Sequence, residues 1–272
     1  MKNSLLLLSF LSFLLVNCSP SSSDYYSSGI KKNESKKYTD AIADFNKAIE
    51  LDPQFAEAYD GRGTAKSHLN DIEGAIADYT KAIEINPQFA EAYDGRGTAK
   101  INLNDYEGAI ADYTKLIEIN PQSAEAYDGR GTAKDELKDH KGALADYNKA
   151  IEINPQYADA YYNRGIAKFH LNDIEGAIAD YTKLIEINPQ YAEAYYNRGA
   201  AKRSLNDYEG AIADYTKLIE INPQYAEAYY NRGLVKIFLK QKEGCLDLSK
   251  AEELGIEKAH EVINEYCKWF IE

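Results

Sequence analysis

The sequence is poor in the residues that build most metal and catalytic sites: its 272 residues include only four histidines, three cysteines and one tryptophan. No histidine pairs with Cys, Asp or Glu at the spacing of zinc ligands, and no set of nucleophile, base and orienting group is apparent. The sequence therefore predicts no metal, no cofactor and no enzyme activity. Basic residues are also outnumbered, with 31 Lys and Arg against 44 Asp and Glu and a net charge of -13. This balance argues against a nucleic-acid partner and is typical of a solvated, soluble surface.

No apolar run is long enough to cross a bilayer, since the longest, from Leu5 to Val16, has about twelve residues. It follows Lys2 and precedes Cys18, which is the arrangement of a secretory signal. The segment ending Leu-Val-Asn-Cys resembles the lipobox of bacterial lipoproteins, although that family usually has Gly, Ala or Ser where Asn17 stands. We expect a signal peptide over 1–17, a lipid on Cys18 and a short linker over 18–21. The protein would then be extracytoplasmic, anchored at the periplasmic face or the cell surface of a bacterial membrane; ordinary signal cleavage is the alternative.

A period of 34 residues dominates the rest of the chain. Six prolines follow it without exception: Pro53, Pro87, Pro121, Pro155, Pro189 and Pro223. Before them, apolar residues fall at helical spacings of three and four, and each Asn-Pro or Asp-Pro pair ends that helix. A unit of this kind cannot bury its apolar face alone, so neighbouring units must stack.

One period, 56–89, shows the residues that carry a family resemblance: Tyr59, Gly63, Ala75, Tyr79, Ala82 and Pro87. They match the signature positions of the tetratricopeptide repeat (TPR), a helix-turn-helix unit of about 34 residues. The resemblance implies an all-α, right-handed superhelical solenoid of paired antiparallel helices. Seven repeats are expected over 22–55, 56–89, 90–123, 124–157, 158–191, 192–225 and 226–259, followed by a capping helix over 260–272. The last repeat looks degenerate, with Cys245, Ser249 and Glu252 at its small, aromatic and small positions.

In the resembled family, positions two, five, six, nine, twelve and thirteen of the first helix line a concave groove. Positions two and five are acidic in repeats two to four: Glu57 and Asp60, Glu91 and Asp94, Glu125 and Asp128. Positions five and six in repeats five to seven are Tyr162 and Asn163, Tyr196 and Asn197, Tyr230 and Asn231. Such a row resembles the asparagine ladder of the O-linked N-acetylglucosamine transferase repeats, in which Asn hydrogen-bonds a peptide backbone. The alternative is that these side chains are only solvated helix-face residues.

The expected function is a non-catalytic scaffold that binds a protein or an extended peptide in this groove. Chaperone-adaptor repeats clamp a terminal carboxylate with Lys and Arg at positions two, five and six, whereas these positions are acidic or neutral here. A carboxylate-terminated chaperone tail is therefore disfavoured. The runner-up is a glycan or cell-wall binding module, because exposed Tyr can stack on sugar rings.

Two internal pairings are also expected. Arg fills the seventh position in every repeat but the first, which has Ser28, and Asp fills the twenty-third in every repeat but the last, which has Leu248. This pattern predicts forward pairing, for example of Asp78 with Arg96 of the next repeat; independent decay of the terminal repeats is the alternative. Cys245 and Cys267 should lie close together, either as a disulfide or as two small buried hydrophobes.

Overall fold

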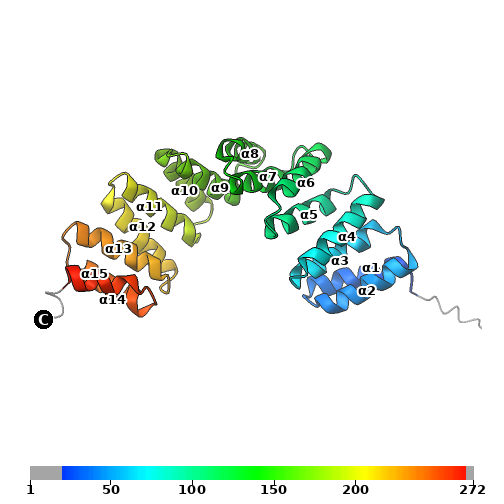
Figure 1. Cartoon of the computed structure of the whole chain (residues 1–272), viewed down its shortest axis with the longest axis horizontal. Helices are drawn as coiled ribbons and strands as arrows, with labels where there is room; N and C mark the ends of the chain where they lie inside the picture. The colour runs from blue at the N-terminus through cyan, green and yellow to red at the C-terminus, as the bar shows by residue number, and fades with distance from the viewer. Residues whose placement is uncertain (1–19, 268–272) are drawn as a thin grey trace, which may run out of the picture. The chain divides into compact units, whose positions relative to one another are not determined.

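The computed structural model describes residues 20–267, and every regular element in that range is an α-helix (Figure 1). The expected all-α fold is thus confirmed. The predicted signal peptide and Cys18 lie outside the described residues, as does 268–272 of the predicted capping helix. Between residues 20 and 267, no helix has the length and the hydrophobicity that a bilayer crossing requires.

The helices form two compact units, which meet in the sequence between Pro87 and Gln88. Unit 1 contains α1 (Ser22–Glu34), α2 (Tyr38–Leu51), α3 (Ala56–His68) and α4 (Ile72–Ile85). The helices of unit 2 are α5 (Ala90–Asn102), α6 (Tyr106–Ile119), α7 (Ala124–Glu136), α8 (His140–Ile153), α9 (Ala158–His170), α10 (Ile174–Ile187), α11 (Ala192–Ser204), α12 (Tyr208–Ile221), α13 (Ala226–Phe238), α14 (Gly244–Glu253) and α15 (Lys258–Tyr266).

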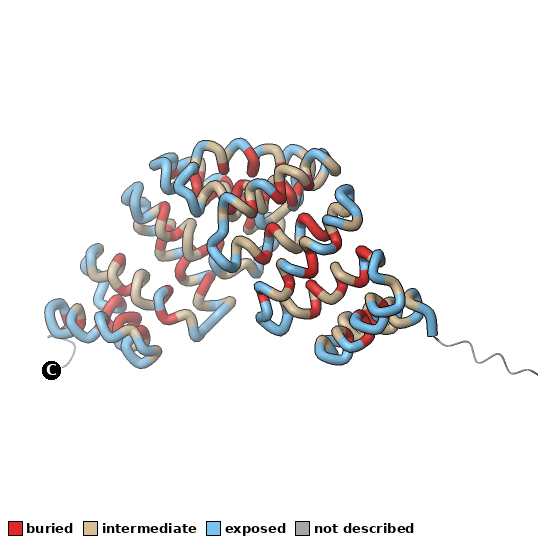
Figure 2. The backbone as a smooth tube through the Cα atoms, turned by 45° about the vertical axis from the view of Figure 1, so that its right-hand side comes forward, coloured by how far each residue is buried: buried red, intermediate tan, exposed pale blue. Residues whose placement is uncertain are grey.

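Each odd-numbered helix up to α13 packs against the helix that follows it, so the chain is a series of helical hairpins. The turn inside a hairpin uses a residue with positive φ, such as Asn172 at 63°, a conformation that Asn tolerates better than most residues. The next residue, Asp173, then caps α10 by accepting a hydrogen bond from the Gly176 amide. Figure 2 shows that these turns are mostly exposed, whereas buried positions recur along the helices.

The core of each hairpin but the last is an aromatic ring lying on a glycine; in the last hairpin Leu248 takes this place on Gly233. A Cβ added to Gly131 would lie 2.7 Å from the ring of Tyr147, and one added to Gly165 would lie 2.6 Å from that of Tyr181. Both rings are at most 2% exposed. Glycine is unfavourable inside a helix, but here it gives the ring its place between the two helices.

A second buried feature is an ionic triad that joins the two helices of a hairpin. In unit 2, Asp146 of α8 accepts from Arg130 at 2.7 Å and from Lys134 at 2.6 Å, both of α7. Equivalent triads hold Asp78, Asp112, Asp180, Asp214 and Asp247. In the first hairpin, which has Ser28 at the position of the Arg, Lys32 pairs with Asp44 at 2.6 Å.

The expected forward pairing of Asp with the Arg of the next repeat is therefore wrong. The guanidinium reaches the Asp of its own hairpin through Nε and Nη2, because the helices of one hairpin are packed side by side. Its Nη1 reaches the preceding hairpin instead, where it donates to a Thr or Asn: Arg130 to Thr114 at 3.2 Å, Arg164 to Asn148 at 2.7 Å and Arg198 to Thr182 at 3.0 Å. Arg at this position thus links two hairpins, and the first hairpin has no predecessor within the repeats.

The last repeat is also different from the prediction, because the segment from the positive-φ turn residue to the buried Asp is one residue shorter than in other hairpins: Asp247 follows Lys240 by seven residues, whereas Asp180 follows Asn172 by eight. Arg232 pairs with Asp247, 15 residues on, whereas the other pairs are 16 residues apart. The small, aromatic and small positions are therefore Gly244, Leu248 and Ala251, all buried, and not Cys245, Ser249 and Glu252. The repeat keeps its Asp and its small residues after all.

Cys245 and Cys267 lie close together, as expected, and form a disulfide with a Cα–Cα distance of 5.9 Å. Both are fully buried and join Leu248 and Ile263 in one apolar cluster. The bond fixes the end of α15 to α14. This closing helix begins at Lys258, two residues before the predicted start of the cap.

Candidate functional site

The predicted groove residues lie on the first helices of the hairpins, in both units. Glu57 and Asp60 belong to α3 of unit 1. The other ten lie in unit 2: Glu91 and Asp94 on α5, Glu125 and Asp128 on α7, Tyr162 and Asn163 on α9, Tyr196 and Asn197 on α11, and Tyr230 and Asn231 on α13. Unit 2 therefore holds both an acidic and an aromatic part of the predicted surface.

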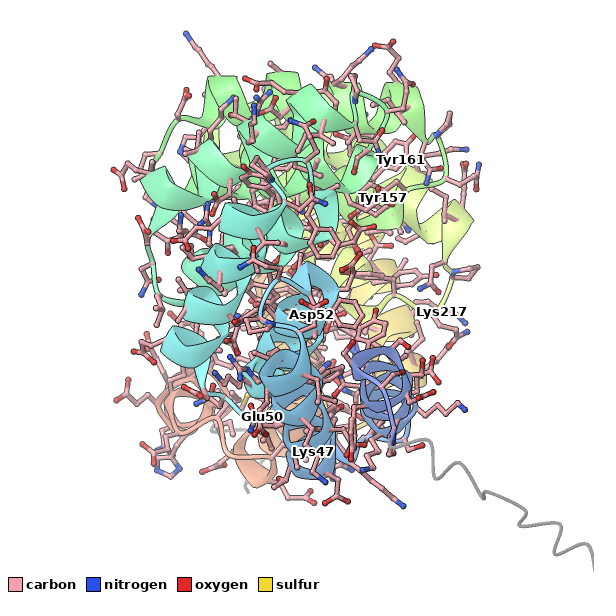
Figure 3. The ribbon with its side chains drawn as sticks, turned by 90° about the vertical axis from the view of Figure 1, so that its right-hand side faces the viewer. Lys47, Glu50, Asp52, Tyr157, Tyr161 and Lys217 are labelled. Atoms are coloured by element: carbon pink, nitrogen blue, oxygen red, sulfur yellow. A yellow bond between two sulfur atoms is a disulfide. The ribbon has the colours of Figure 1, made fainter. Side chains whose placement is uncertain are left out.

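Carboxylates crowd together at the start of α5, α7 and α9. Burial raises the pKa of the Tyr157 phenol, and the charges of Asp128, Asp159, Glu125 and Asp94 raise this pKa further, so these four carboxylates lie near Tyr157. Figure 3 labels Tyr157 just before α9 and Tyr161 one turn further on. We call Glu91, Asp94, Glu125, Asp128 and Asp159 the acidic cluster.

The carboxylates of this cluster repel one another. The Asp94 side chain is exposed at its surface, yet the surrounding protein displaces enough water to raise its pKa, and Glu125 and Glu91 add repulsion. Basic side chains of the same helices do not pair with these carboxylates, because they form the ionic triads with buried Asp residues. Arg96 and Lys100 pair with Asp112, and Arg130 and Lys134 pair with Asp146.

Asp128 is the most deeply buried member of the cluster, with 8% of its surface exposed. Burial raises its pKa to about 6; the Asn163 hydrogen bond opposes this rise, and the charges of Asp159 and Glu125 add to it. The Asn163 amide donates to both carboxylate oxygens, at 3.0 and 3.3 Å. Asn163 is therefore bound inside the protein.

Asn231 is also bound within the chain, while Asn197 is placed differently. The Asn231 amide nitrogen donates to the Glu227 carbonyl at 2.9 Å and to the Tyr196 hydroxyl at 3.2 Å, and its oxygen accepts from Arg203 at 3.1 Å. Asn197 instead lines a cavity. The three asparagines thus differ in their surroundings, although they occupy one position of the repeat.

The predicted tyrosines are half-buried, and the rings of Tyr162 and Tyr196 pack against other aromatic rings of their own repeats. Tyr162 lies 5.4 Å from Tyr191 and 6.4 Å from Tyr181, measured between ring centroids. Tyr196 repeats this arrangement with Tyr225 and Tyr215, at 5.5 and 6.1 Å. Such tilted packing fixes the orientation of the rings.

Tyr230 differs because the closing helix covers it. The Lys258 ammonium lies 4.4 Å from the centre of its ring, and the ring packs against the cluster that contains the disulfide. Lys258 and the closing helix therefore cover the ring of Tyr230, which is the equivalent of Tyr162 in α9 and of Tyr196 in α11.

A cavity of about 290 Å³ lies between α9, α10 and α11. Two predicted residues, Tyr162 and Asn197, line it, together with Ile166, Phe169, His170, Tyr181 and Ala200. Sequence reasoning missed Ile166, Phe169, His170 and Ala200, although they stand at positions nine, twelve and thirteen, which belong to the groove in the resembled family. The His170 ring also stacks on that of His140, 5.0 Å away.

Comparisons with known proteins agree with this architecture. YrrB, described as a TPR protein with an unusual peptide-binding site, is 26% identical over 69% of this chain and 97% of its own, with a TM-score of 0.57. MamA is 28% identical over 61% of this chain and 96% of its own, with a TM-score of 0.56. A tetratricopeptide repeat protein from Parabacteroides merdae is 23% identical over 93% of this chain and 100% of its own, with a TM-score of 0.68, and shows the fold.

No curated protein matches the chain. The family model described as TPR repeat matches six times, over 32–67, 68–102, 97–134, 136–171, 167–202 and 199–236. These matches extend over most of the helical hairpins, and the chain belongs to the TPR repeat family.

Proposed function

We propose that this chain is a non-catalytic scaffold that binds an extended segment of another protein along the first helices of unit 2. The TPR fold is one of protein–protein interaction, and repeat proteins bind through extended surfaces built from equivalent helices. The observation that carries the proposal is the cavity between α9 and α11, beside the acidic cluster. A bound segment can insert an apolar side chain into the cavity and place a polar side chain beside the acidic cluster.

The acidic cluster also indicates which class of partner the site disfavours. A terminal carboxylate would approach the acidic cluster, where five like charges already oppose one another, so a carboxylate-clamp interaction remains disfavoured. YrrB, at 26% identity, is a precedent within the family for peptide binding.

The test is capture of partners from native envelope by wild-type protein and by a Tyr162→Ala/Tyr196→Ala double variant. We expect the wild type to retain a protein that the double variant loses. Tyr25→Ala, in α1 of unit 1, is the control and should retain it; circular dichroism shows that each variant is folded. Capture that survives the double change would refute this site, and binding to purified peptidoglycan in place of protein would favour a cell-wall module.

We also propose that the scaffold is extracytoplasmic and held on a membrane by a lipid on Cys18. The lipobox-like sequence before Cys18 supports this, and the Cys245–Cys267 disulfide supports an oxidising compartment independently. Detergent partitioning of the wild type and of Cys18→Ala tests the anchor. The variant should move to the aqueous phase; equal partitioning of both proteins would refute the anchor.

A further inference from the structure

At the cavity between α9, α10 and α11, the ninth position of the repeat is small in one hairpin and large in the hairpins on either side. Ala200 stands there in α11, whereas α9 has Ile166 and α13 has Leu234. Ile166 of α9 and Ala200 of α11 both line the cavity, and Phe169 and Tyr162 are aromatic residues of its lining. Its volume of about 290 Å³ lies at the lower end of pockets that hold a whole small molecule, which run from roughly 300 to 1,000 Å³. It has room for an apolar side chain of a partner.

The wall of this cavity is continuous with the acidic cluster through α9. Tyr162 lines the cavity, and the next residue, Asn163, donates to Asp128. Asp159 lies one turn before Asn163 on the same helix and adds to the repulsion that Asp128 experiences. A peptide that fills the cavity with one side chain and continues toward the start of α9 would therefore pass the carboxylates of the acidic cluster.

These carboxylates have no cation of their own helices beside them, because the ionic triads use the cations. Arg164 and Lys168 of α9 pair with Asp180, as Arg130 and Lys134 of α7 pair with Asp146. A cation supplied by a partner would relieve the repulsion within the cluster, and complementary charge of this kind favours both association rate and specificity.

We propose that the site selects a basic peptide segment with one apolar anchor: an aliphatic or aromatic side chain enters the cavity, and a Lys or Arg nearby contacts the acidic cluster. This inference rests on the proposed function and adds the chemistry of the partner. Asp159 and Ile166 are separated by seven residues of helix, about 10 Å at 1.5 Å per residue. An extended peptide covers that distance in about three residues. The basic residue should stand about three positions from the anchor.

Synthetic peptides test the proposal by fluorescence polarisation with the purified chain. One peptide carries Leu or Phe as the anchor and Lys three positions away; a second replaces the Lys with Glu, and a third replaces the anchor with Ser. The first should bind at least tenfold more tightly than either of the others. Equal affinity for the Lys and Glu peptides, or for the anchored and Ser peptides, would overturn the proposal.

Two variants separate the two halves of the site. Ala200→Leu, which gives α11 the residue that α13 already has, should weaken binding of anchored peptides about tenfold and keep the preference for Lys over Glu. The control is Ala213→Leu at an exposed position of α12. Asp128→Asn should reduce the preference for Lys over Glu several-fold and keep the anchor preference. Its control is Glu186→Gln, which removes the same charge from an exposed side chain of α10.

The failure of this inference differs from the failure of the proposed function. If the envelope partner is lost with Tyr162→Ala/Tyr196→Ala but peptides with and without the basic residue bind alike, the scaffold function stands and the basic-anchor chemistry is wrong. If the partner is retained by that double variant, the site itself is wrong. If Ala200→Leu leaves anchored-peptide affinity unchanged, the cavity is not the anchor site.

Discussion

Asp128 is a buried carboxyl group whose ionised form is disfavoured in the folded state. Its pKa is raised from 3.8 to about 6, chiefly by burial, so the folded state binds this proton more tightly than the unfolded state does. The stability that comes from this proton is fully present below about pH 4 and is lost as the pH rises through 6. Asn imitates the protonated carboxyl and can still accept from Asn163.

We therefore expect Asp128→Asn to be more stable than the wild type at pH 7.5, by roughly 1–3 kcal/mol. Urea unfolding followed by circular dichroism measures the difference, which should shrink towards zero at pH 4. A variant less stable than the wild type at pH 7.5 would show that the ionised carboxylate stabilises the fold. A stabilising loss of a charge would fit a residue kept for binding.

Substitution of a single arginine, Arg130, tests how much an ionic triad contributes to stability. Asp146 is buried and keeps only Lys134 when Arg130→Met removes the guanidinium. The free energy of unfolding should fall by about 2–4 kcal/mol, somewhat less than for a buried ion left with no partner. Lys149→Met is the comparison, because Lys149 pairs with Glu152 at 2.7 Å on an exposed face, where such a pair contributes about 0.5 kcal/mol or less. Similar losses for both variants would contradict a special role for the triad.

Among the elements, α15 depends most on a covalent bond, since the helix has nine residues and the Cys245–Cys267 bond closes a loop with a sequence separation of 22. A loop of this length predicts a contribution of about 3 kcal/mol from the disulfide, through the entropy of the unfolded chain. We expect the Cys245→Ala/Cys267→Ala variant to lose hydrogen-exchange protection in α14 and α15 and to retain it in α7 to α10. Uniform loss of protection along unit 2 would indicate that the repeats unfold together with their cap.

The helices themselves were largely predictable, because period, proline and glycine positions all act locally. The pairing of Arg with Asp was not, since each Arg has an Asp at a plausible separation both in its own repeat and in the preceding one. Only the packing of the hairpin decides between them. The missing residue between Lys240 and Asp247 was hidden for a similar reason: a one-residue deletion shifts Asp247 and Leu248 without changing their chemistry. A comparison of the spacing from Arg232 to each nearby Asp would have revealed it.

Tyr162 and Asn197, at positions five and six, line the cavity, but the cavity itself was not predictable. The row of asparagines predicts one surface, yet Asn163 and Asn231 bind partners within the chain, whereas Asn197 lines the cavity. Which member of a repeated row stays available depends on its neighbours in the adjacent hairpin. The size of Ala200 also matters for the cavity. It stands out only when it is compared with Ile166 and Leu234, the larger residues at the same position of the neighbouring repeats.

At the scale of the whole molecule, the net charge of -13 opposes compaction, while the triads that hold the hairpins are buried. Salt screens the exposed repulsion more strongly than the buried pairs. We expect the melting temperature to rise by a few degrees between 20 and 300 mM NaCl, about 1 kcal/mol of stability for a chain of this size. Thermal melts followed by circular dichroism measure it, with sucrose at equal osmolarity as the control. A melting temperature that falls with salt would mean that exposed ion pairs outweigh the repulsion.

The two-sided bonding of the arginine has a consequence for how such a gene can change. Within unit 2, Arg130, Arg164 and Arg198 each take one partner from their own hairpin and one from the hairpin before, and those partners are Asp and then Thr or Asn throughout. Unequal recombination between neighbouring copies would add or remove 34 codons and leave each junction with the same donors and acceptors. The encoded protein could therefore change length in whole repeats between alleles, with its first hairpin and its disulfide-bonded end unaltered.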